Sequence, residues 1–463
     1  MDTRRSPTVS ARDAFGHHPG DSAVIRSLHQ APALLPVAGP TGVGQAGPDG
    51  VATGAQRLHI GIAGPVATRD IRQLLNDPAQ TLPAGYDGAP LMAALIQALI
   101  AQGHRVSTYT LSTDMPLGGP RSVLADGPNF SIEYCAMRPR AWRPNGLRLG
   151  RILDFYAFER CTLEAAIVRA RPDVVHAHWA YEFAWAGLRS GRPCLVTSHD
   201  SPFTIARFYK GFTLGGYRWL RAMMAWHVLR HARAVSTVSP YMAAQIQHLC
   251  RVPVQLVPNP LGDQVFAVKR VREPGRCRVL IVCNGWSAHK NPEPALRAFA
   301  AVALRMPRAE LVVLGHGFGP GQQGEGWWRD QGLQGNVRFI GAVAYPQVLQ
   351  WMAQSDLLLH PSVEESFGAV IAEAMAVGLP VVAGQASGAV PWVVGEHGRL
   401  VDVHEPAAMA AAMLELLSDT PLRETLGHAA RTSVASRFSA AAVVAKYLDL
   451  YAQVRANAAA VPA

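Results

Sequence analysis

The sequence is short of charge and has no long apolar run. Charged residues make up only 16% of its 463 residues, although hydrophobic residues make up 49%. No run of 18 apolar residues occurs, and the first residues lack the charged-then-apolar pattern of a secretory signal, so we expect neither a membrane-spanning helix nor a leader peptide. Apolar residues in short runs are typical of buried parallel sheets, and the length is enough for two or three domains.

Cysteine is scarce as well. The six cysteines form no Cys-x-x-Cys pair and lie far apart in the chain: Cys135, Cys161, Cys194, Cys250, Cys277 and Cys283. This scatter argues against a disulfide framework and predicts reduced thiols, mostly in the core, in a cytoplasmic protein.

Acidic residues are missing from one long stretch of a chain whose net charge is +10. None occurs between Asp200 and Asp263, where basic residues are mixed with aromatic ones, and a second basic run lies further upstream. The basic residues are Arg207, Lys210, Arg218, Arg221, Arg230, Arg233 and Arg251 in the first stretch and Arg138, Arg140, Arg143, Arg148 and Arg151 in the second. This mixture suits an anionic membrane surface or a ligand that carries phosphates, and an ordinary solvated face remains an equal alternative. None of the nucleic-acid-binding motifs is present, so we expect no nucleic-acid partner.

Short apolar runs alternate with helical segments twice along the chain. The expected strands are 58–63, 106–110, 174–178, 194–198 and 234–238, then 279–283, 310–314, 337–340, 356–359 and 379–383. Such alternation predicts an α/β fold of two facing Rossmann-like domains, each with a parallel sheet, and a ligand in the cleft between them at the carboxyl ends of the strands. Residues 1–56 are rich in Pro, Gly and Ala without a period, and we expect a disordered N-terminal tail.

The most informative segment is 356–383, which predicts strand, loop, helix and strand. Glu365 lies just before the helix 369–377 and Glu373 lies on its second turn. Gly368 allows the backbone to approach a ligand closely, and Gly378 ends the helix. The first amides of such a helix have no intrahelical partner and form a site where an anion binds well.

This segment resembles the donor-site pattern of the retaining glycosyltransferases of family 4, which have the GT-B fold. The family carries Glu-x7-Glu in the context Pro-Ser-x-x-Glu-x-Phe-Gly-x-x-x-x-Glu-Ala-Met-x-x-Gly-x-Pro-Val-Val, and residues 361–382 match nearly every defined position. The resemblance extends over residues 58–455 and is closer in the second half. It implies an acceptor domain at 57–258, a nucleotide-sugar donor domain at 259–436, and a final helix at 437–463 that crosses back to the first domain before a short tail.

The resemblance assigns a set of donor-binding residues. Lys290 matches the lysine that binds the diphosphate of the donor, Glu373 matches the contact to the ribose hydroxyls, and Glu365 matches a catalytic contact to the transferred sugar. Backbone amides of Ser366, Phe367 and Gly368 are expected near the sugar and phosphates, and Arg338 on the strand 337–340 is either a ligand contact or a structural charge. The family usually has arginine where this chain has Gly285, so we expect the second phosphate contact to come from Asn284, Trp286 or a backbone amide of the Gly285 turn. The expected donor is a UDP- or GDP-sugar, with no other cofactor.

The first half contributes acceptor-side residues. His199, at the end of the strand 194–198, resembles the family histidine close to the reacting sugar and is the second catalytic candidate. His178 and Trp179, at the end of the preceding strand, are expected to line the acceptor side, and Gly88 belongs to a loop that approaches both substrates. His176 and His178 alternate on one strand face, as a metal pair would, but no third ligand accompanies them and we expect no metal site. The chain also has no Asp-x-Asp, the motif with which glycosyltransferases of another fold hold a metal ion.

The resulting hypothesis is a metal-independent retaining glycosyltransferase. It would move a hexose from a nucleotide diphosphate to a hydroxyl of a glycan or lipid-linked acceptor in polysaccharide or glycolipid synthesis, in the cytoplasm and peripherally on the inner face of the membrane. A nucleotide-sugar epimerase of the same architecture and a binding protein without turnover are the alternatives. A dinucleotide dehydrogenase is disfavoured because the glycines around the first strand do not form Gly-x-Gly-x-x-Gly.

Overall fold

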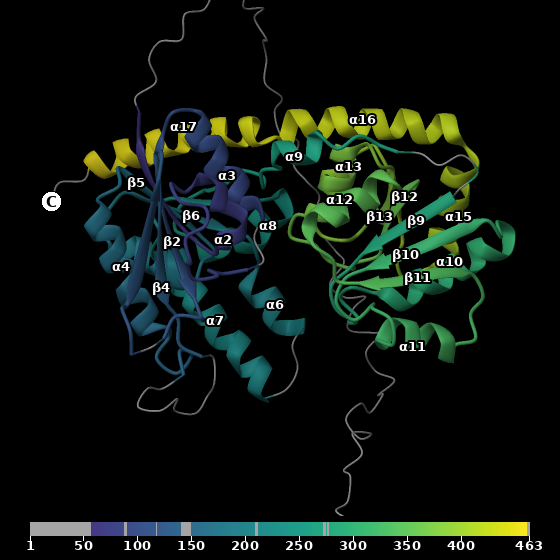
Figure 1. The fold of residues 1–463 in the computed structure, drawn as a ribbon, viewed down its shortest axis with the longest axis horizontal. Helices are drawn as coiled ribbons and strands as arrows, with labels where there is room; N and C mark the ends of the chain where they lie inside the picture. The colour runs from purple at the N-terminus through teal and green to yellow at the C-terminus, as the bar shows by residue number, and fades with distance from the viewer. Residues whose placement is uncertain are drawn as a thin grey trace, which may run out of the picture. The chain divides into compact units, whose positions relative to one another are not determined.

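The computed structural model describes residues 57–87, 90–116, 118–139, 150–208, 212–271, 275 and 277–460. The expected tail at 1–56 and the candidate site residue Gly88 lie outside these ranges. Two parallel sheets, each with its own helices, organise the described chain (Figure 1). The predicted α/β class with two Rossmann-like halves is therefore confirmed.

The first sheet has eight strands in the order β3-β4-β2-β1-β5-β6-β7-β8. Their bounds are β1 His59–Ala63, β2 Arg105–Ser112, β3 Ser122–Gly127, β4 Phe130–Ala136, β5 Val174–His178, β6 Cys194–Ser198, β7 Val235–Thr237 and β8 Val254–Leu256. All neighbours are parallel except β3, which pairs with β4 in an antiparallel hairpin. The central strands are buried along nearly their whole length because helices cover both faces, which explains their continuous apolar sequences.

The second sheet has six parallel strands in the order β11-β10-β9-β12-β13-β14. They are β9 Cys277–Val282, β10 Ala309–Leu314, β11 Asn336–Gly341, β12 Leu357–His360, β13 Val381–Gly384 and β14 Arg399–Val401. β9 and β12 are direct neighbours at the centre of the sheet, although 74 residues lie between the end of β9 and the start of β12. The loops that follow these two strands therefore leave the sheet at the same edge.

Helices connect the strands of both sheets. In the first half they are α2 Thr68–Ile71, η1 Arg72–Leu74, α3 Pro90–Ala101, α4 Ala157–Ala170, α5 Glu182–Arg189, α6 Pro202–Phe208, α7 Phe212–His231, α8 Pro240–Ile246, η2 Gln247–Leu249 and α9 Asp263–Phe266. In the second half they are α10 Pro292–Arg305, α11 Gln323–Asp330, α12 Tyr345–Ala353, α13 Ala369–Val377, α14 Val390–Val394, α15 Pro406–Ser418, α16 Thr420–Phe438 and α17 Ala440–Ala459. Within the described ranges, no helix is both long and apolar enough to cross a membrane.

The last helix belongs to the core of the first sheet. α17 follows α16 directly and packs against α3, β5 and β6 (Figure 1). Tyr447 and Tyr451 on its inner face are buried in the same hydrophobic cluster as Ile60 and Ile62 of β1. Burial of each of these aromatic side chains contributes about 1.5–3 kcal/mol through its apolar area. This burial holds α17 against the first sheet, although the helix follows the second sheet in the sequence.

One element was not predicted from the sequence. The β3–β4 hairpin was missed because β3 is only partly buried and lacks a continuous apolar run. The six cysteines are free and mostly in the core, as predicted, with five buried and Cys161 on α4 exposed.

Candidate functional site

The loops after β9 and β12 meet through an ion pair. The ammonium Nζ of Lys290 lies 2.6 Å from Oε1 of Glu365, and the two residues are 75 positions apart. This contact follows from the neighbouring positions of β9 and β12, since both loops start at the carboxyl edge of the sheet where ligands of open α/β folds bind. The structure thus brings together the two residues that the sequence assigned to the diphosphate and the sugar.

Asn291 ties these loops into one unit. Its amide Nδ2 donates to the carbonyl of Pro361 at 3.2 Å and to that of Val403 at 2.7 Å. The backbone amide of Val363 also donates to the carbonyl of His289 at 2.9 Å. Asn291 has a φ of +53° and precedes α10, so an asparagine, which tolerates this left-handed conformation, fits the position. Lys290 is therefore held beside the loop that carries Glu365.

Glu365 receives two donors on one oxygen. Besides the Lys290 ammonium, Nε2 of His360 at the end of β12 lies 3.2 Å from Oε1. Burial alone would raise the pKa of Glu365, but the hydrogen bond from His360 and the positive charge of Lys290 lower that pKa well below its usual range. Glu365 is consequently ionised at neutral pH.

The segment after Glu365 forms the start of α13. Gly368 has a φ of +83°, a left-handed conformation that favours glycine, and it immediately precedes the first helical residue. Phe367 is buried with its ring 5.1 Å from that of Phe438, which anchors the turn. Ser366 lies directly before Phe367 and after Glu365. The first amides of α13 have no intrahelical partner, and they follow the residue that contacts Lys290.

Glu373 lies inside the second turn of α13 and is buried. Its Oε1 accepts a hydrogen bond of 2.9 Å from the hydroxyl of Tyr345, the first residue of α12. Burial raises the pKa of Glu373 to about 7, although the hydrogen bond from Tyr345 opposes the shift. This carboxyl therefore titrates near neutrality, unlike Glu365.

The acceptor-side candidates form a stack at the ends of β5 and β6. Nδ1 of His178 and Nε2 of His199 are 2.9 Å apart, and the ring of Trp179 stacks on that of His199 with centroids 4.2 Å apart. Burial lowers the pKa of His199 to about 3 and that of His178 well below its usual value. Both rings are neutral, so one donates to the other, and His199 is suited to hydrogen bonding rather than to taking a proton.

His176 belongs to the core rather than to this stack. Its Nδ1 and Nε2 are 2.7 Å from the Tyr451 hydroxyl and the Thr197 hydroxyl, and the side chain is fully buried. Both ring nitrogens are thus satisfied by the protein. In the described part of the chain, no three His, Cys, Asp or Glu side chains form a group that could hold a metal ion.

The two remaining predicted donor residues, Arg338 and Gly285, lie at different places relative to the second sheet. Arg338 lies in the middle of β11, where its guanidinium is 3.4 Å from Glu310 and stands over the ring of Trp351. Glu310 is near the amino end of β10, so the structure does not bring Arg338 to the carboxyl edge. Gly285 is at that edge, with a φ of +92° and its amide bonded to the carbonyl of His316 at 2.9 Å. An arginine would be strained in this backbone conformation.

A contact from the first half of the chain reaches the Glu365 segment. The hydroxyl of Ser239, which caps α8, donates to the carbonyl of Ser366 at 2.6 Å. The hydroxyl of Tyr241 on the first turn of α8 donates to Oε1 of Glu364 at 2.9 Å. We call these two hydrogen bonds the α8 clasp. They join Glu364 and Ser366, the neighbours of Glu365, to α8, the helix that follows β7.

Sequence reasoning missed four of these residues. His360 was not among the predicted site residues, although a polar side chain at the carboxyl end of a buried parallel strand is a signal for a site residue. Tyr345, Ser239 and Tyr241 have no local signal, because their roles depend on partners between 28 and 127 residues away.

The basic stretch is less exposed than its sequence suggested. Arg221 on α7 is 3.1 Å from Glu182 and hydrogen-bonds to the Tyr156 hydroxyl at 2.8 Å, with 12% of its side chain exposed. Arg138 is 2.7 Å from the buried Glu159 and 2.8 Å from Asp154. These two arginines neutralise internal carboxylates, so they do not contribute to a basic surface. Arg140, Arg143, Arg148 and Lys210 lie outside the described residues.

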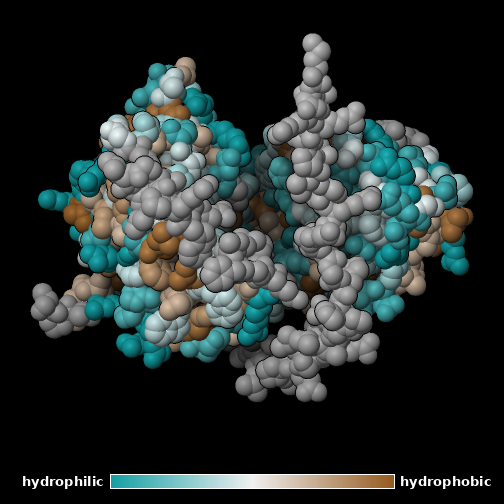
Figure 2. All heavy atoms as spheres, turned by 90° about the horizontal axis from the view of Figure 1, so that it is seen from below, coloured by the Kyte–Doolittle hydropathy of each residue, from teal (hydrophilic) through white to brown (hydrophobic). Residues whose placement is uncertain are grey.

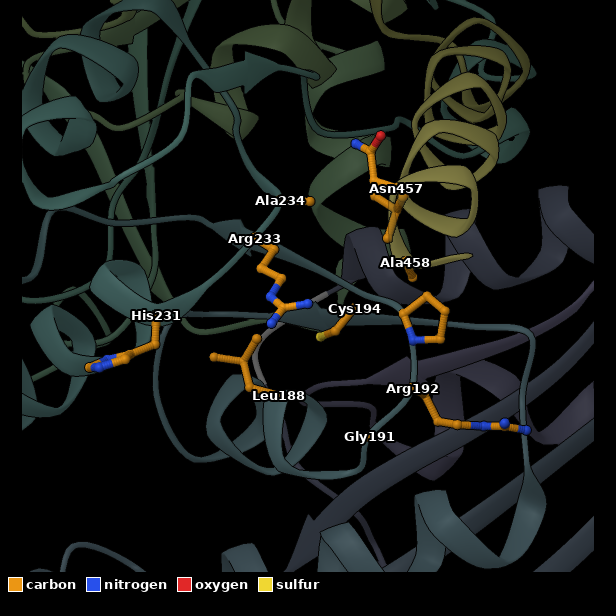
Figure 3. Close-up of a pocket in the computed structure, with 11 residues that line it drawn as sticks. Leu188, Gly191, Arg192, Cys194, His231, Arg233, Ala234, Asn457 and Ala458 are labelled. Atoms are coloured by element: carbon orange, nitrogen blue, oxygen red, sulfur yellow. The ribbon is translucent and has the colours of Figure 1, made fainter. Parts of the chain in front are cut away.

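A cavity of about 670 Å³ lies elsewhere, at the amino ends of β6 and β7 (Figure 3). Cys194, the first residue of β6, and Ala458 on α17 line it, together with three basic side chains. In Figure 3, Arg192 and His231 extend to opposite sides and only Arg233 points to the centre, so these groups do not converge on one ligand position. The cavity contains none of the predicted site residues.

Comparisons with known proteins agree on one family. A family model described as "Glycosyltransferase Family 4" matches residues 90–263, and one described as "Glycosyl transferases group 1" matches residues 276–419. The D-inositol 3-phosphate glycosyltransferase of Corynebacterium kroppenstedtii is 37% identical over 170 residues, which are 35% of this chain and 37% of that protein. The N-acetyl-alpha-D-glucosaminyl L-malate synthase of Bacillus anthracis is 31% identical over 178 residues, 38% of this chain and 45% of its own length. The aligned regions thus span less than half of these relatives.

Solved structures resemble the fold over most of the chain. Sucrose-phosphate synthase from Thermosynechococcus elongatus has a TM-score of 0.65 and 20% identity, with 87% of this chain and all of that chain covered. Anabaena HepE in complex with UDP and glucose has a TM-score of 0.60 and 18% identity, with coverages of 86% and 100%. At these identities the likeness concerns the fold alone.

Proposed function

Because the chain belongs to the glycosyltransferases of family 4 and has their GT-B fold, we propose that it transfers a sugar from a nucleotide diphosphate to an acceptor hydroxyl. The observation that supports this most directly is the 2.6 Å contact of Lys290 with Glu365 beside the amino end of α13. A cation, a helix amino end and an ionised carboxylate are what a diphosphate and a sugar hydroxyl require at adjacent positions.

The donor is proposed to bind along the second half of the chain, within 259–436. The diphosphate contacts Lys290 and the amides of Ser366, Phe367 and Gly368, which stabilise the charge that develops on the leaving group. The ribose hydroxyls donate to Glu373, and the hexose contacts Glu365. The cation and amides supply the positive field at the phosphates, and we propose that transfer needs no divalent ion.

The transfer is proposed to retain the anomeric configuration. The acceptor oxygen forms the new bond to the anomeric carbon on the face that the diphosphate leaves, the carbon–phosphate oxygen bond breaks, and the acceptor proton passes to the leaving phosphate oxygen. His199 takes part as a neutral hydrogen-bonding group, because a ring whose pKa is about 3 is a poor proton acceptor at neutral pH.

Binding of candidate donors tests the proposal. Thermal unfolding is measured with UDP, GDP, UDP-glucose and GDP-mannose, each with and without EDTA. A ligand at a hundred times its dissociation constant adds about 2.7 kcal/mol of stability, so the true donor raises the unfolding midpoint by several degrees, and EDTA leaves the shift unchanged. The Glu373→Ala substitution is expected to abolish this shift of the unfolding midpoint. Binding without transfer or release of free sugar would favour a binding protein without turnover, the alternative that Gly285 in place of arginine supports. If no ligand shifts the unfolding midpoint, that result would contradict the donor site.

The acceptor is proposed to bind to residues 57–258 beside the stack of His178, Trp179 and His199. The final segment, 437–463, completes this half through α17. We propose a glycan or lipid-linked acceptor, used in polysaccharide or glycolipid synthesis at the cytoplasmic face of a membrane. This proposal predicts that the protein contacts the membrane through a surface of its first half.

One face of α7 supports this proposal. Trp219, Met223 and Trp226 follow one another at spacings of four and three residues, so they share one helix face, and each is 48–57% exposed. The exposed Arg233 follows the helix. Figure 2, seen from below relative to Figure 1, shows hydrophobic patches among hydrophilic residues on the part of the surface left of centre. Tryptophan at the interface and nearby arginine suit an anionic lipid surface.

Vesicle sedimentation tests this surface. The wild type is expected to sediment with vesicles that contain phosphatidylglycerol and less with pure phosphatidylcholine, and Trp219→Ser with Trp226→Ser lowers the bound fraction several-fold. Leu304→Ser is the matched control, because Leu304 is 77% exposed on α10 of the other half. Equal sedimentation of the double variant and the control would contradict a role of α7 in membrane contact.

A further inference from the structure

We propose that His360 is a positioning residue that holds Glu365 in place for the sugar of the donor. The inference deepens the proposed function and rests on it. It arises from the way in which two donors share the carboxylate: Nζ of Lys290 and Nε2 of His360 both contact Oε1, at 2.6 and 3.2 Å. Within the described residues, Oε2 has no hydrogen-bond partner. One oxygen of Glu365 is therefore fixed by the protein, and the other is left for a ligand.

The two donors differ in what else they must do. Lys290 has a long flexible side chain, 27% exposed, and the proposed diphosphate binds to its ammonium. His360 is the last residue of β12, its side chain is 5% exposed, and its position is set by the strand. When the diphosphate draws the ammonium of Lys290 toward itself, the contact from His360 can remain. A buried carboxylate that lost its only donor would be costly, so a second, immobile donor allows Lys290 to serve the phosphates.

The consequence concerns the sugar rather than the nucleotide. A carboxylate held by Nε2–H of His360 on Oε1 presents the lone pairs of Oε2 in a fixed direction, and two neighbouring sugar hydroxyls can donate to it. The nucleotide is proposed to bind to Lys290, Glu373 and the start of α13, and within the described residues none of these side chains or amides hydrogen-bonds to the ring of His360. Loss of the His360 contact should therefore weaken binding of the sugar and leave binding of the nucleotide diphosphate unchanged.

Two amide variants provide a matched pair. In His360→Gln the side-chain NH2 group occupies the place of Nε2 and can still donate to Glu365, whereas in His360→Asn the shorter amide mimics Nδ1 and leaves Oε1 without this donor. His428→Leu, an exposed histidine on α16, is the control for an unrelated substitution. Calorimetric titrations with UDP and UDP-glucose, and with GDP and GDP-mannose, measure how much the sugar adds to the affinity of the preferred nucleotide.

The expected result is a selective loss. His360→Asn should lower the affinity for the nucleotide sugar roughly tenfold or more, as for a hydrogen bond to a charged group, while the affinity for the nucleotide diphosphate stays within about twofold of wild type. His360→Gln should restore most of the loss. A parallel loss for nucleotide and nucleotide sugar, or an unchanged sugar contribution in His360→Asn, would overturn the inference. Failure of the wild type to bind any of the four ligands would instead contradict the proposed function itself.

Discussion

Tyr345 donates a hydrogen bond of 2.9 Å to a carboxyl group, Glu373, that is buried and whose pKa burial raises to about 7. Within the described residues this is the only hydrogen bond to that side chain. A ribose diol would add two more donors, and these bind more strongly to an ionised carboxylate than to a neutral acid. Donor binding should therefore favour the ionised form of Glu373, with release of its proton to solvent as the ligand binds.

This coupling predicts a pH-dependent affinity. As pH falls through about 7, Glu373 becomes protonated, and the affinity for UDP-glucose should decrease, approaching tenfold for each pH unit further down. UDP-glucose is preferred to UDP because it has no terminal phosphate that titrates near neutrality. Calorimetry from pH 5.5 to 8.5 in two buffers of different ionisation enthalpy measures both affinity and proton release. Glu373→Gln should bind weakly at every pH. A flat profile for the wild type would mean that Glu373 is ionised throughout or takes no part.

The same raised pKa predicts how stability changes with pH in the empty protein. A carboxyl whose folded pKa exceeds its unfolded value stabilises the fold below the unfolded pKa, and this contribution is lost as pH rises through the folded pKa. For Glu373 the window extends from the usual value of 4.5 to about 7. At pH 8 the buried charge should cost on the order of 3 kcal/mol, so Glu373→Gln is expected to be more stable than wild type there and no more stable at pH 4.

Urea unfolding of the two proteins at both pH values measures this difference. The comparison is informative because Glu373→Gln, which weakens donor binding, would also stabilise the fold at pH 8, so the ionised Glu373 is a stability cost of function. An equal difference at pH 4 and pH 8 would contradict the assignment of the shift to burial of Glu373.

Features that depend on neighbouring residues in the sequence were predictable, and features that depend on contacts between distant residues were not. The strands 174–178 and 194–198 were predicted to the residue because a buried parallel strand is a continuous apolar run. The helix of Glu373 was also predicted to the residue, since glycines with positive φ mark both of its ends. The β3–β4 hairpin was missed because β3 is partly exposed, and because the buried β4 contains Ser131 and Glu133, so neither strand is a continuous apolar run.

The site was predictable where one segment supplies its residues. Lys290 and Glu365 were assigned separately, each from its match to the family pattern, and the pairing of β9 with β12 brings them within 2.6 Å. The direction of the Arg338 side chain was not predictable, because it depends on Glu310 of the neighbouring strand β10. The burial of Arg221 was not predictable for a similar reason, since its carboxylate partner Glu182 comes from elsewhere in the chain.

The α8 clasp predicts that Tyr241 supports turnover through Glu364. Tyr241→Phe removes a hydrogen bond of 2.9 Å and should lower stability by about 1–2 kcal/mol. Because the adjacent Glu365 contacts the sugar in the proposed site, kcat should fall while the affinity for UDP stays near that of wild type. A double-mutant cycle with Glu364→Gln measures the coupling, expected between about 0.5 and 3 kcal/mol. Strictly additive effects would show that the two side chains act independently.

The pairing of Arg221 with Glu182 makes a final prediction, about the basic stretch itself. The guanidinium is 3.1 Å from a carboxylate that is only 2% exposed, and it also donates to the Tyr156 hydroxyl. Removing one partner of a buried pair leaves the other charge without compensation, so Arg221→Met should cost about 3–5 kcal/mol in urea unfolding. Arg233→Met, at an exposed position just after the same helix, should change stability by no more than about 0.5 kcal/mol.

The combined variant of Arg221→Met with Glu182→Gln decides between an interior and a surface role for Arg221. If the arginine serves the buried carboxylate, removing both charges should recover part of the stability that the single substitution loses, because no uncompensated ion remains. Sedimentation with anionic vesicles should be unchanged once the protein is folded. A stable Arg221→Met protein that has lost vesicle binding would place this arginine on the membrane-facing surface and contradict the ion pair as its main role.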